Sequence, residues 1–346
     1  MKFTAVQMIG TQRSGSNLLR LMLNQLNEVS APHPPHILER FIPLLSAYGD
    51  LCDTENFNLL VHDVCSLVAY NPVQWKYINL KEDEIIRRCS THSLAAIVKV
   101  IYEMNAKNKG AHIWICKSLS NIHFTDLLEE EIKPCYIFLY RDGRDVASSF
   151  KRAVVGEKHV YHIAKQWQHE QDLCLKLYEQ LDDKRIIKVC YEDLILQPEK
   201  ELKRVCEFIG AKYNSACLEY YNSQEAKNTA SSGKMWQNVE RKIIVDNFNR
   251  YKKELTVDEI MLFEKIAGET LEALNYTLDF SSQSDKQIST GEIRMYDELN
   301  TFLKQKAKLQ QKPGDAEKRL MQEALINNIR KRLNHISYNE VEKIAV

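Results

Sequence analysis

The 346-residue chain lacks the features of a disulfide framework, a structural zinc site or a membrane span. Its nine cysteines are irregularly spaced and include no C-x-x-C pair, which argues against zinc and disulfides alike. No stretch approaches the ~18 apolar residues of a membrane-spanning helix, and the apolar run at the amino terminus is too short for a signal peptide. We therefore expect a cytoplasmic protein with reduced thiols.

An excess of charge is also absent, because 47 lysines and arginines balance 47 aspartates and glutamates. A nucleic-acid-binding protein needs a strongly basic surface, so this balance argues against a nucleic-acid partner. The apolar fraction of 44% and the charged fraction of 27% are those of an ordinary globular protein. The length is sufficient for one large domain or two smaller ones.

Short apolar runs, separated by helical patterns, predict buried strands. They are TAVQMI from Thr4, HIWICK from His112, CYIFLY from Cys135 and RIIKVCY from Arg185. Nearly continuous apolar runs are typical of parallel strands that helices cover on both faces. The sequence therefore predicts an α/β fold with a parallel sheet flanked by helices.

Two segments depart from this alternation. Residues 32–110 open with three prolines and continue as helices rich in leucine and aromatic residues, among them Phe41 and Tyr48. Such an insertion is either plain helical packing or a cap over a binding site, because α/β sheets bind ligands at the carboxyl ends of their strands.

After about residue 280 the chain is polar and ends in a basic amphipathic helix, ALINNIRKRL. A solvated helix, a dimer contact and a dock on a membrane surface are the alternatives for it.

The segment after the first predicted strand, IGTQRSGSNLL, has the spacing of a phosphate-binding loop. Gly10 and Gly15 allow the backbone to turn, and a helix beginning near Ser16 directs N–H groups and its dipole at an anion. The loop departs from G-x-x-x-x-G-K-[ST], since Ser16 and Asn17 replace the Lys-Ser/Thr pair that would serve magnesium. Arg13 supplies a cation instead. A purely structural turn is the alternative.

A second anion site is indicated by YIFLYRDGRDVASSF. The predicted strand ends at Tyr140, which puts Arg141 at its carboxyl end, and Ser149 follows one turn into the next helix. An arginine and a hydroxyl that converge there can bind a phosphate. A structural pair between Arg141 and Asp145 is the alternative.

Together, QRSGSN and the R-x-x-x-D-x-x-x-S spacing from Arg141 to Ser149 resemble the sulfotransferase family, in its bacterial-type, P-loop-like form. Members of this family use 3′-phosphoadenosine 5′-phosphosulfate (PAPS) as donor. ICKSLSN and VCYEDLILQPEKELKRVCEFIGA are similar to two further family segments, and the similarity extends from Phe3 to roughly Leu278. We expect a sulfotransferase domain over residues 1–280, with residues 32–110 as an acceptor cap, and a helical extension over 281–346.

The resemblance implies a role for each matching residue. Arg13 and Lys117 would balance charge on the sulfuryl group and on the departing phosphate, and Tyr191 would lie near the adenine. The remaining donor-binding residues are implied in the same way: Ser14, Gly15, Ser16 and Asn17 for the 5′-phosphate, Arg141 and Ser149 for the 3′-phosphate, and Gly233 and Lys234 in a closing loop. The match of this last pair is approximate, because the family's R-K-G triplet is absent.

The general base follows neither family pattern. One branch places a histidine two residues after the strand lysine, where this chain has Leu119. Other branches place a glutamate near the position of His33, which lies 20 residues after Arg13. The region APHPPHILER offers His33, His36 and Glu39 as proton acceptors, and we rank them in that order.

The resemblance implies in-line transfer of the sulfuryl group from PAPS to an acceptor hydroxyl, with a histidine base and no metal. The apolar insertion favours a small lipid- or sterol-like alcohol as acceptor, with a glycan or glycolipid as the alternative. A P-loop nucleotide kinase and a non-catalytic nucleotide-binding module are the competing hypotheses. The missing Lys-Ser/Thr pair argues against the kinase.

Overall fold

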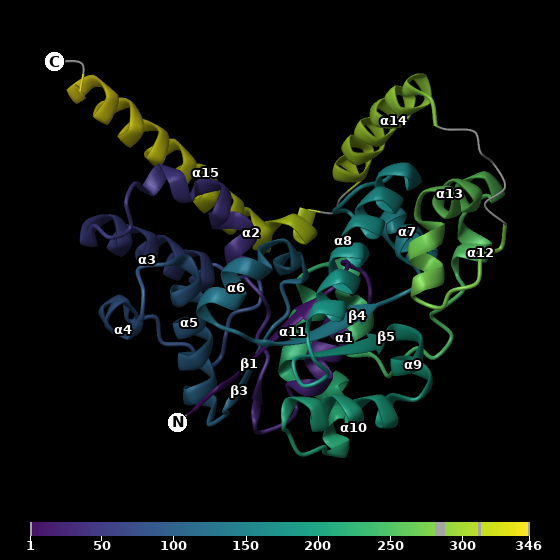
Figure 1. Ribbon diagram of the computed structural model, residues 1–346, viewed down its shortest axis with the longest axis horizontal. Coiled ribbons are helices and arrows are strands. Elements are labelled where there is room, and N and C mark those ends of the chain that lie inside the picture. Colours follow the sequence, from purple (N-terminus) through teal and green to yellow (C-terminus); the bar gives the residue numbers. More distant parts are fainter. Residues whose placement is uncertain (1, 281–287, 311–312, 345–346) are drawn as a thin grey trace.

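A computed structural model describes residues 2–280, 288–310 and 313–344. Its centre is a parallel sheet in the order β2-β3-β1-β4-β5 (Figure 1). The strands are β1 (Thr4–Ile9), β2 (Val29–Ser30), β3 (Ile113–Cys116), β4 (Cys135–Tyr140) and β5 (Ile186–Cys190). The predicted α/β fold and all four predicted strands are confirmed. The fifth strand, β2, has two residues and is too short to produce a pattern in the sequence.

Helices cover both faces of the sheet, which explains the continuous apolar runs. Tyr136 and Phe138 of β4 belong to one buried cluster, and Ile137 and Leu139 belong to the other. The smaller cluster lies under α1 (Ser16–Leu23), α9 (Tyr191–Leu196), α10 (Pro198–Ile209), η3 (Ser215–Asn222) and α11 (Gln224–Ser231). The larger cluster lies under α5 (Leu94–Lys109), α6 (Thr125–Glu131), α7 (Gly143–Arg152), α8 (Val160–Gln180) and α13 (Val257–Ala273).

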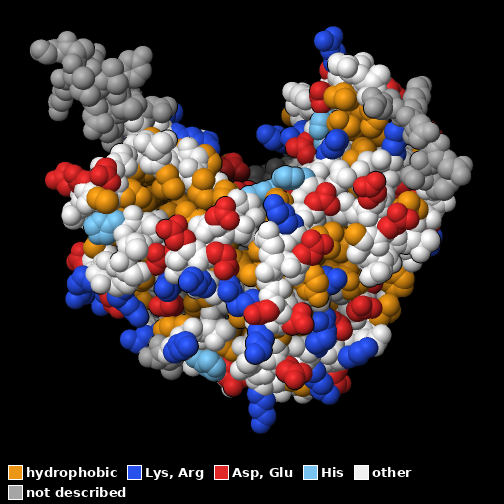
Figure 2. Space-filling view, viewed as in Figure 1, with side chains coloured by type: hydrophobic (Ala, Val, Ile, Leu, Met, Phe, Trp, Pro, Cys, Tyr) orange, Lys and Arg blue, Asp and Glu red, His pale blue; other side chains and the backbone are white. Residues whose placement is uncertain are grey.

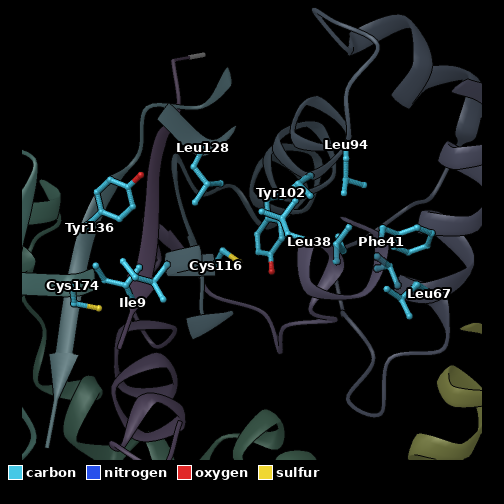
Figure 3. Close-up of a cluster of buried hydrophobic side chains, with 14 of the residues drawn as sticks. Ile9, Leu38, Phe41, Leu67, Leu94, Tyr102, Cys116, Leu128, Tyr136 and Cys174 are labelled. Carbon is cyan, nitrogen blue, oxygen red and sulfur yellow. The ribbon is translucent and has the colours of Figure 1, made fainter. Parts of the chain in front are cut away.

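The insertion shares the larger core rather than forming a separate unit. Before α5 it comprises α2 (Ile37–Phe41), the 3-10 helix η1 (Ile42–Tyr48), α3 (Thr54–Ala69) and α4 (Glu82–Arg88). Figure 3 shows Phe41 surrounded by Leu38, Leu67 and Leu94. Phe41 and Tyr48 are therefore core residues, and neither lines the two cavities described below.

The carboxyl-terminal part consists of the 3-10 helix η4 (Lys234–Glu240), α12 (Tyr251–Glu254), α13, α14 (Thr290–Leu309) and α15 (Pro313–Ile344). Helix α15 packs on α3 and η1 (Figure 1). Ile329 and Leu333 are buried there, the Gln322 amide donates to the carbonyl of Leu67 over 2.9 Å, and Arg332 pairs with Asp63. A fully solvated tail helix is therefore excluded.

None of the described helices has the length and apolar character that crossing a membrane requires. All nine cysteines are free thiols, and five of them are buried: Cys65, Cys116, Cys174, Cys206 and Cys217.

Candidate active site

The predicted phosphate loop connects β1 to α1 in a conformation that requires glycine at two positions. Gly10 has a φ of +133°, and a β-carbon there would overlap the backbone carbonyl of Leu139 in β4. Gly15 has a φ of +87°, and its β-carbon would overlap the ring of Tyr191. The loop therefore lies directly on the end of β4, under the tyrosine predicted to contact adenine.

Strand register brings the other predicted donor residues to the same edge. Gln7 of β1 pairs with Cys116 of β3, and Ile9 of β1 pairs with Phe138 of β4. Lys117 follows β3 directly and Arg141 follows β4 directly, so both emerge beside the loop. Parallel strands thus gather at one edge residues that lie more than a hundred positions apart in the sequence.

The two predicted anion sites are in contact with each other. Arg13 Nε donates to Ser149 Oγ over 3.0 Å, and Arg141 Nη1 donates to the carbonyl of Arg13 over 3.2 Å. Burial and the nearby charges of Arg141 and Arg152 lower the pKa of Arg13 to about 10. Since these cations repel one another, a bound anion would relieve the repulsion.

Arg141 has both structural and cavity-facing contacts. Its Nη2 donates to the carbonyl of Asn247 over 2.7 Å, and its Nη2 lies 3.7 Å from Asp145 Oδ2. The guanidinium also lies over the ring of Tyr191, 4.4 Å from its centroid, while Asn247 Nδ2 donates to the Tyr191 hydroxyl over 2.7 Å. The ion pair with Asp145 is present, yet Arg141 still lines the cavity described next.

A cavity of about 710 Å³ lies above the loop, and we call it the donor cavity. Among the described residues that line it, no aspartate or glutamate occurs, whereas eight lysines and arginines do. They are Arg13, Lys117, Arg141, Lys151, Arg152, Lys234, Lys242 and Arg250. Figure 2 shows basic and acidic side chains interspersed on the visible outer face. Three of the lining cations pair with carboxylates that do not line the cavity, Lys151 with Glu259, and Arg152 and Arg250 with Glu254. Such a cavity suits a ligand with several anionic groups.

The sequence prediction gave four of the eight cations in this lining and missed the other four: Lys151, Arg152, Lys242 and Arg250. Predicted residues that do line the donor cavity include Gly15, Ser16, Asn17, Ser149, Tyr191 and Lys234. Ser14 is fully buried in the loop, and Gly233 precedes η4 without lining the cavity. The Arg241–Lys242 pair was the available signal for Lys242, and the missing glycine of the family triplet concealed it.

A second cavity of about 590 Å³ adjoins the first, and we call it the histidine cavity. The two share a wall made of Gln12, His36, Lys117, Val155, Met235 and Trp236. His33 and Glu39 also line the histidine cavity. All three predicted base candidates therefore lie together, next to Lys117.

His33 is held by its backbone and buried. Its carbonyl accepts from Asn71 Nδ2 over 2.8 Å and from Trp75 Nε1 over 2.6 Å, whereas within the described part of the chain neither ring nitrogen has a hydrogen-bond partner. Burial lowers the pKa of His33 well below 6.5, and the charges of Arg20 and Lys117 lower it further. The imidazole is therefore neutral at pH 7.

His36 differs from His33 because it has a carboxylate beside it and lines both cavities. Its Nδ1 lies 3.4 Å from Glu39 Oε2, which also accepts from Ser120 Oγ over 2.6 Å. The contact with His36 lowers the pKa of Glu39 to about 2, while burial lowers the pKa of His36. The pair therefore consists of a neutral imidazole and an ionised carboxylate.

Lys117 lies in the shared wall and is buried. Burial lowers its pKa to about 7, and the positive charges of Arg20 and Arg13 contribute. An anion bound beside it would raise that pKa and favour the ammonium form. Among the residues that the structure describes, no group of histidine, cysteine or carboxylate side chains could hold a metal ion.

Comparisons with known proteins identify the family. Solved structures similar to this chain include the sulfotransferase domain of the Synechococcus PCC 7002 olefin synthase, at 22% identity and a TM-score of 0.54, covering 80% of this chain and 97% of that one. The sulfotransferase domain from the curacin biosynthetic pathway follows at 22% identity and a TM-score of 0.49, covering 80% and 99%. STF9 from Mycobacterium avium has 14% identity and a TM-score of 0.43, covering 81% and 79%. No curated protein matches the chain. The model of the sulfotransferase family matches residues 6–215, which is more than half of the sequence, and the chain therefore belongs to that family.

Proposed function

We propose that this sulfotransferase uses PAPS and transfers its sulfuryl group to a hydroxyl of a small acceptor. The observation that carries the proposal is the joining of two unlike cavities through Lys117 and His36. One is lined by cations and has a phosphate loop at its base, and the other holds neutral histidines. An anionic donor and a neutral hydroxyl would meet at the shared wall.

For the donor, the residues at the sheet edge fit three anionic groups. Backbone N–H groups of residues 14–17 would bind the 5′-phosphate, and Arg141 and Ser149 would bind the 3′-phosphate. Arg13 lies between these sites, because it belongs to the loop and also contacts Ser149. Tyr191 would pack against the adenine, and Gly233 and Lys234 would cover the nucleotide. Residues 32–110 and the extension would form the acceptor side.

In the transfer step the acceptor oxygen attacks sulfur in line with the departing bridge oxygen. The new S–O bond forms as the old one breaks, the acceptor proton passes to an imidazole, and the electron pair of the broken bond stays on the 5′-phosphate. Arg13 and Lys117 would stabilise the charge that builds up on the bridge and sulfuryl oxygens. Catalysis would rest on positioning and electrostatics, as in phosphoryl transfer.

We favour His36 as the base and keep His33 as the second candidate. His36 lines both cavities, whereas His33 lines only the histidine cavity. Glu39 beside Nδ1 would orient the ring, leave Nε2 to accept the proton, and stabilise the imidazolium that forms. This order reverses the ranking drawn from sequence position alone.

The lining of the histidine cavity supports a glycan or glycolipid better than a lipid- or sterol-like alcohol. Twelve of the eighteen residues that line it are polar or charged, and the apolar residues are Pro34, Pro72, Val155, Met235, Trp236 and Ile326. A hydroxyl-rich acceptor would provide partners for these polar groups, whereas a sterol would leave them unpaired.

The test is transfer from radiolabelled PAPS to a panel of sugars, glycolipids and sterols in the presence of a chelator. We expect a labelled product and inhibition by 3′-phosphoadenosine 5′-phosphate (PAP). Magnesium-dependent release of phosphate from ATP, without labelled product, would instead identify a kinase. Tight binding of PAP without transfer to any acceptor would identify a binding module.

A further inference from the structure

Helix α15 lies outside the segment that the family model matches, yet it forms part of the histidine cavity. We propose that α15 is the wall that selects the acceptor, and that it selects a polyhydroxylated molecule, a sugar or a sugar-bearing compound. This inference rests on the proposed function and assigns the carboxyl-terminal extension a role in that same site.

The residues of α15 that line the cavity occupy one face of the helix. They are Arg319, Gln322, Glu323, Ile326, Asn327 and Arg330. Their spacing of three and four residues along the helix keeps them on a single stripe that faces His33, His36 and Glu39 across the cavity. Helix α15 therefore contributes a continuous surface more than two turns long, rather than an isolated side chain.

This face is held in a fixed position. Gln322, itself 2% exposed, both lines the cavity and donates to the carbonyl of Leu67 in α3. Two to three turns further along, Ile329 and Leu333 are buried, and Arg332 pairs with the buried carboxylate of Asp63. A wall that selects among acceptors must keep its hydrogen-bonding groups in place, and these contacts do so.

The side chains of the two facing walls can form hydrogen bonds with the hydroxyl groups of an acceptor. Asn327 on α15 offers an amide that donates and accepts. Asn71, which lines the same cavity, donates from its Nδ2 to the carbonyls of His33 and Val73, which leaves its Oδ1 as an acceptor. Glu323 and Arg40 add an acceptor and a donor, and the ring of Trp236 adds a flat apolar surface suited to the C–H face of a sugar ring. The volume of about 590 Å³ fits a small glycan.

The helix provides a matched pair of variants, because Asn327 lines the cavity and its neighbour Asn328 does not, while both are exposed. We compare Asn327→Leu with Asn328→Leu, using methyl glycosides and disaccharides as one acceptor set and cholesterol and long-chain alcohols as the other. Calorimetric titration with PAP measures nucleotide binding independently of the acceptor. The slow hydrolysis of PAPS measures donor turnover without an acceptor. Arg330→Met against Lys331→Met repeats the comparison one turn further along.

We expect the wild-type enzyme to sulfate at least one glycoside. Asn327→Leu should lower kcat/KM for it about tenfold, the effect of losing one hydrogen bond to a substrate hydroxyl, with PAP binding unchanged and Asn328→Leu at the wild-type rate. Sulfation of the sterol or alcohol set alone, equal rates in the two leucine variants, or donor hydrolysis without any sulfated glycoside would each overturn the inference. Failure to bind PAP would overturn the proposed function itself, and the inference with it.

Discussion

The donor cavity and the histidine cavity share a wall but differ in how they are lined. The donor cavity combines eight cations with a glycine loop and has no acidic residue among its described lining. The histidine cavity carries both signs of charge, two imidazoles and several amides. A fixed, highly charged donor can be held by charge, whereas the choice among neutral acceptors requires individually placed hydrogen bonds. Changes in one cavity should therefore affect binding, and changes in the other should affect rate and selectivity.

The strongest test of this division is the general base. His36→Ala should slow the chemical step by ~10²–10⁴-fold while PAP affinity stays intact, as removal of a base does. Since burial lowers the pKa of His36 and the neutral imidazole is the active form, the wild-type rate should rise with pH through that lowered pKa and then level off. Single-turnover assays with labelled donor measure this step.

His33→Ala is the matched control, because His33 is also buried and neutral but lines only the histidine cavity. If His33→Ala slows the chemical step and His36→Ala leaves its rate unchanged, the base is His33. If the chemical step is as fast in both alanine variants as in the wild type, Glu39 or a group elsewhere accepts the proton.

The next largest effect concerns Arg13, which lines the donor cavity and which we propose acts on the reaction. Arg13→Ala should lower turnover by about a hundredfold or more, the scale for losing one preorganised charge at a transition state. Arg13→Lys should recover part of the rate, since it restores the charge without the planar fork. Near-normal turnover in the alanine variant would exclude Arg13 from catalysis.

A variant at Arg141 tests whether the donor cavity recognises the 3′-phosphate. Arg141→Ala should weaken PAP by about 2–3 kcal/mol, the scale of charge-assisted hydrogen bonds, and barely change the affinity for adenosine 5′-phosphosulfate, which lacks that phosphate. Calorimetric titration of both nucleotides gives the two affinities. An equal loss for both, or a lowered melting temperature, would favour a structural role through the contacts with Asn247 and Asp145.

The smallest effect is a proton taken up at the shared wall. Lys117 has a pKa of about 7 in the free protein, and an anionic donor beside it should raise that pKa. Binding of PAP should then take up a fraction of a proton above pH 7, and PAP affinity should fall as the pH rises further. Calorimetry in buffers of different ionisation enthalpy detects the uptake. Lys117→Met should abolish it, and unchanged uptake in that variant would assign the proton to another group.

The two cavities also differ in how far the sequence predicts them. Of the proposed donor-binding residues, Lys117 and Arg141 directly follow strands and Arg13 lies in the loop after another. The apolar runs of these strands are obvious, so a local pattern sufficed. The histidine cavity combines residues 33–40 with α15, which lies almost three hundred residues later and docks through tertiary contacts. No local pattern encodes such docking. For the insertion, Phe41 and Tyr48 favour the alternative of helical packing, because both fill the core.

The shared wall also gives the protein an optical signal of its own. The chain has four tryptophans, and the structure describes all of them. Trp75, Trp114 and Trp167 are buried and line neither cavity, whereas half-buried Trp236 lines both and lies edge-on to His33, with ring centroids 5.7 Å apart. Changes in indole emission on adding nucleotide or acceptor should therefore come mainly from Trp236, although Trp75 also contacts the site through its hydrogen bond to the His33 carbonyl. Stopped-flow fluorescence can then follow the filling and emptying of the site without a label.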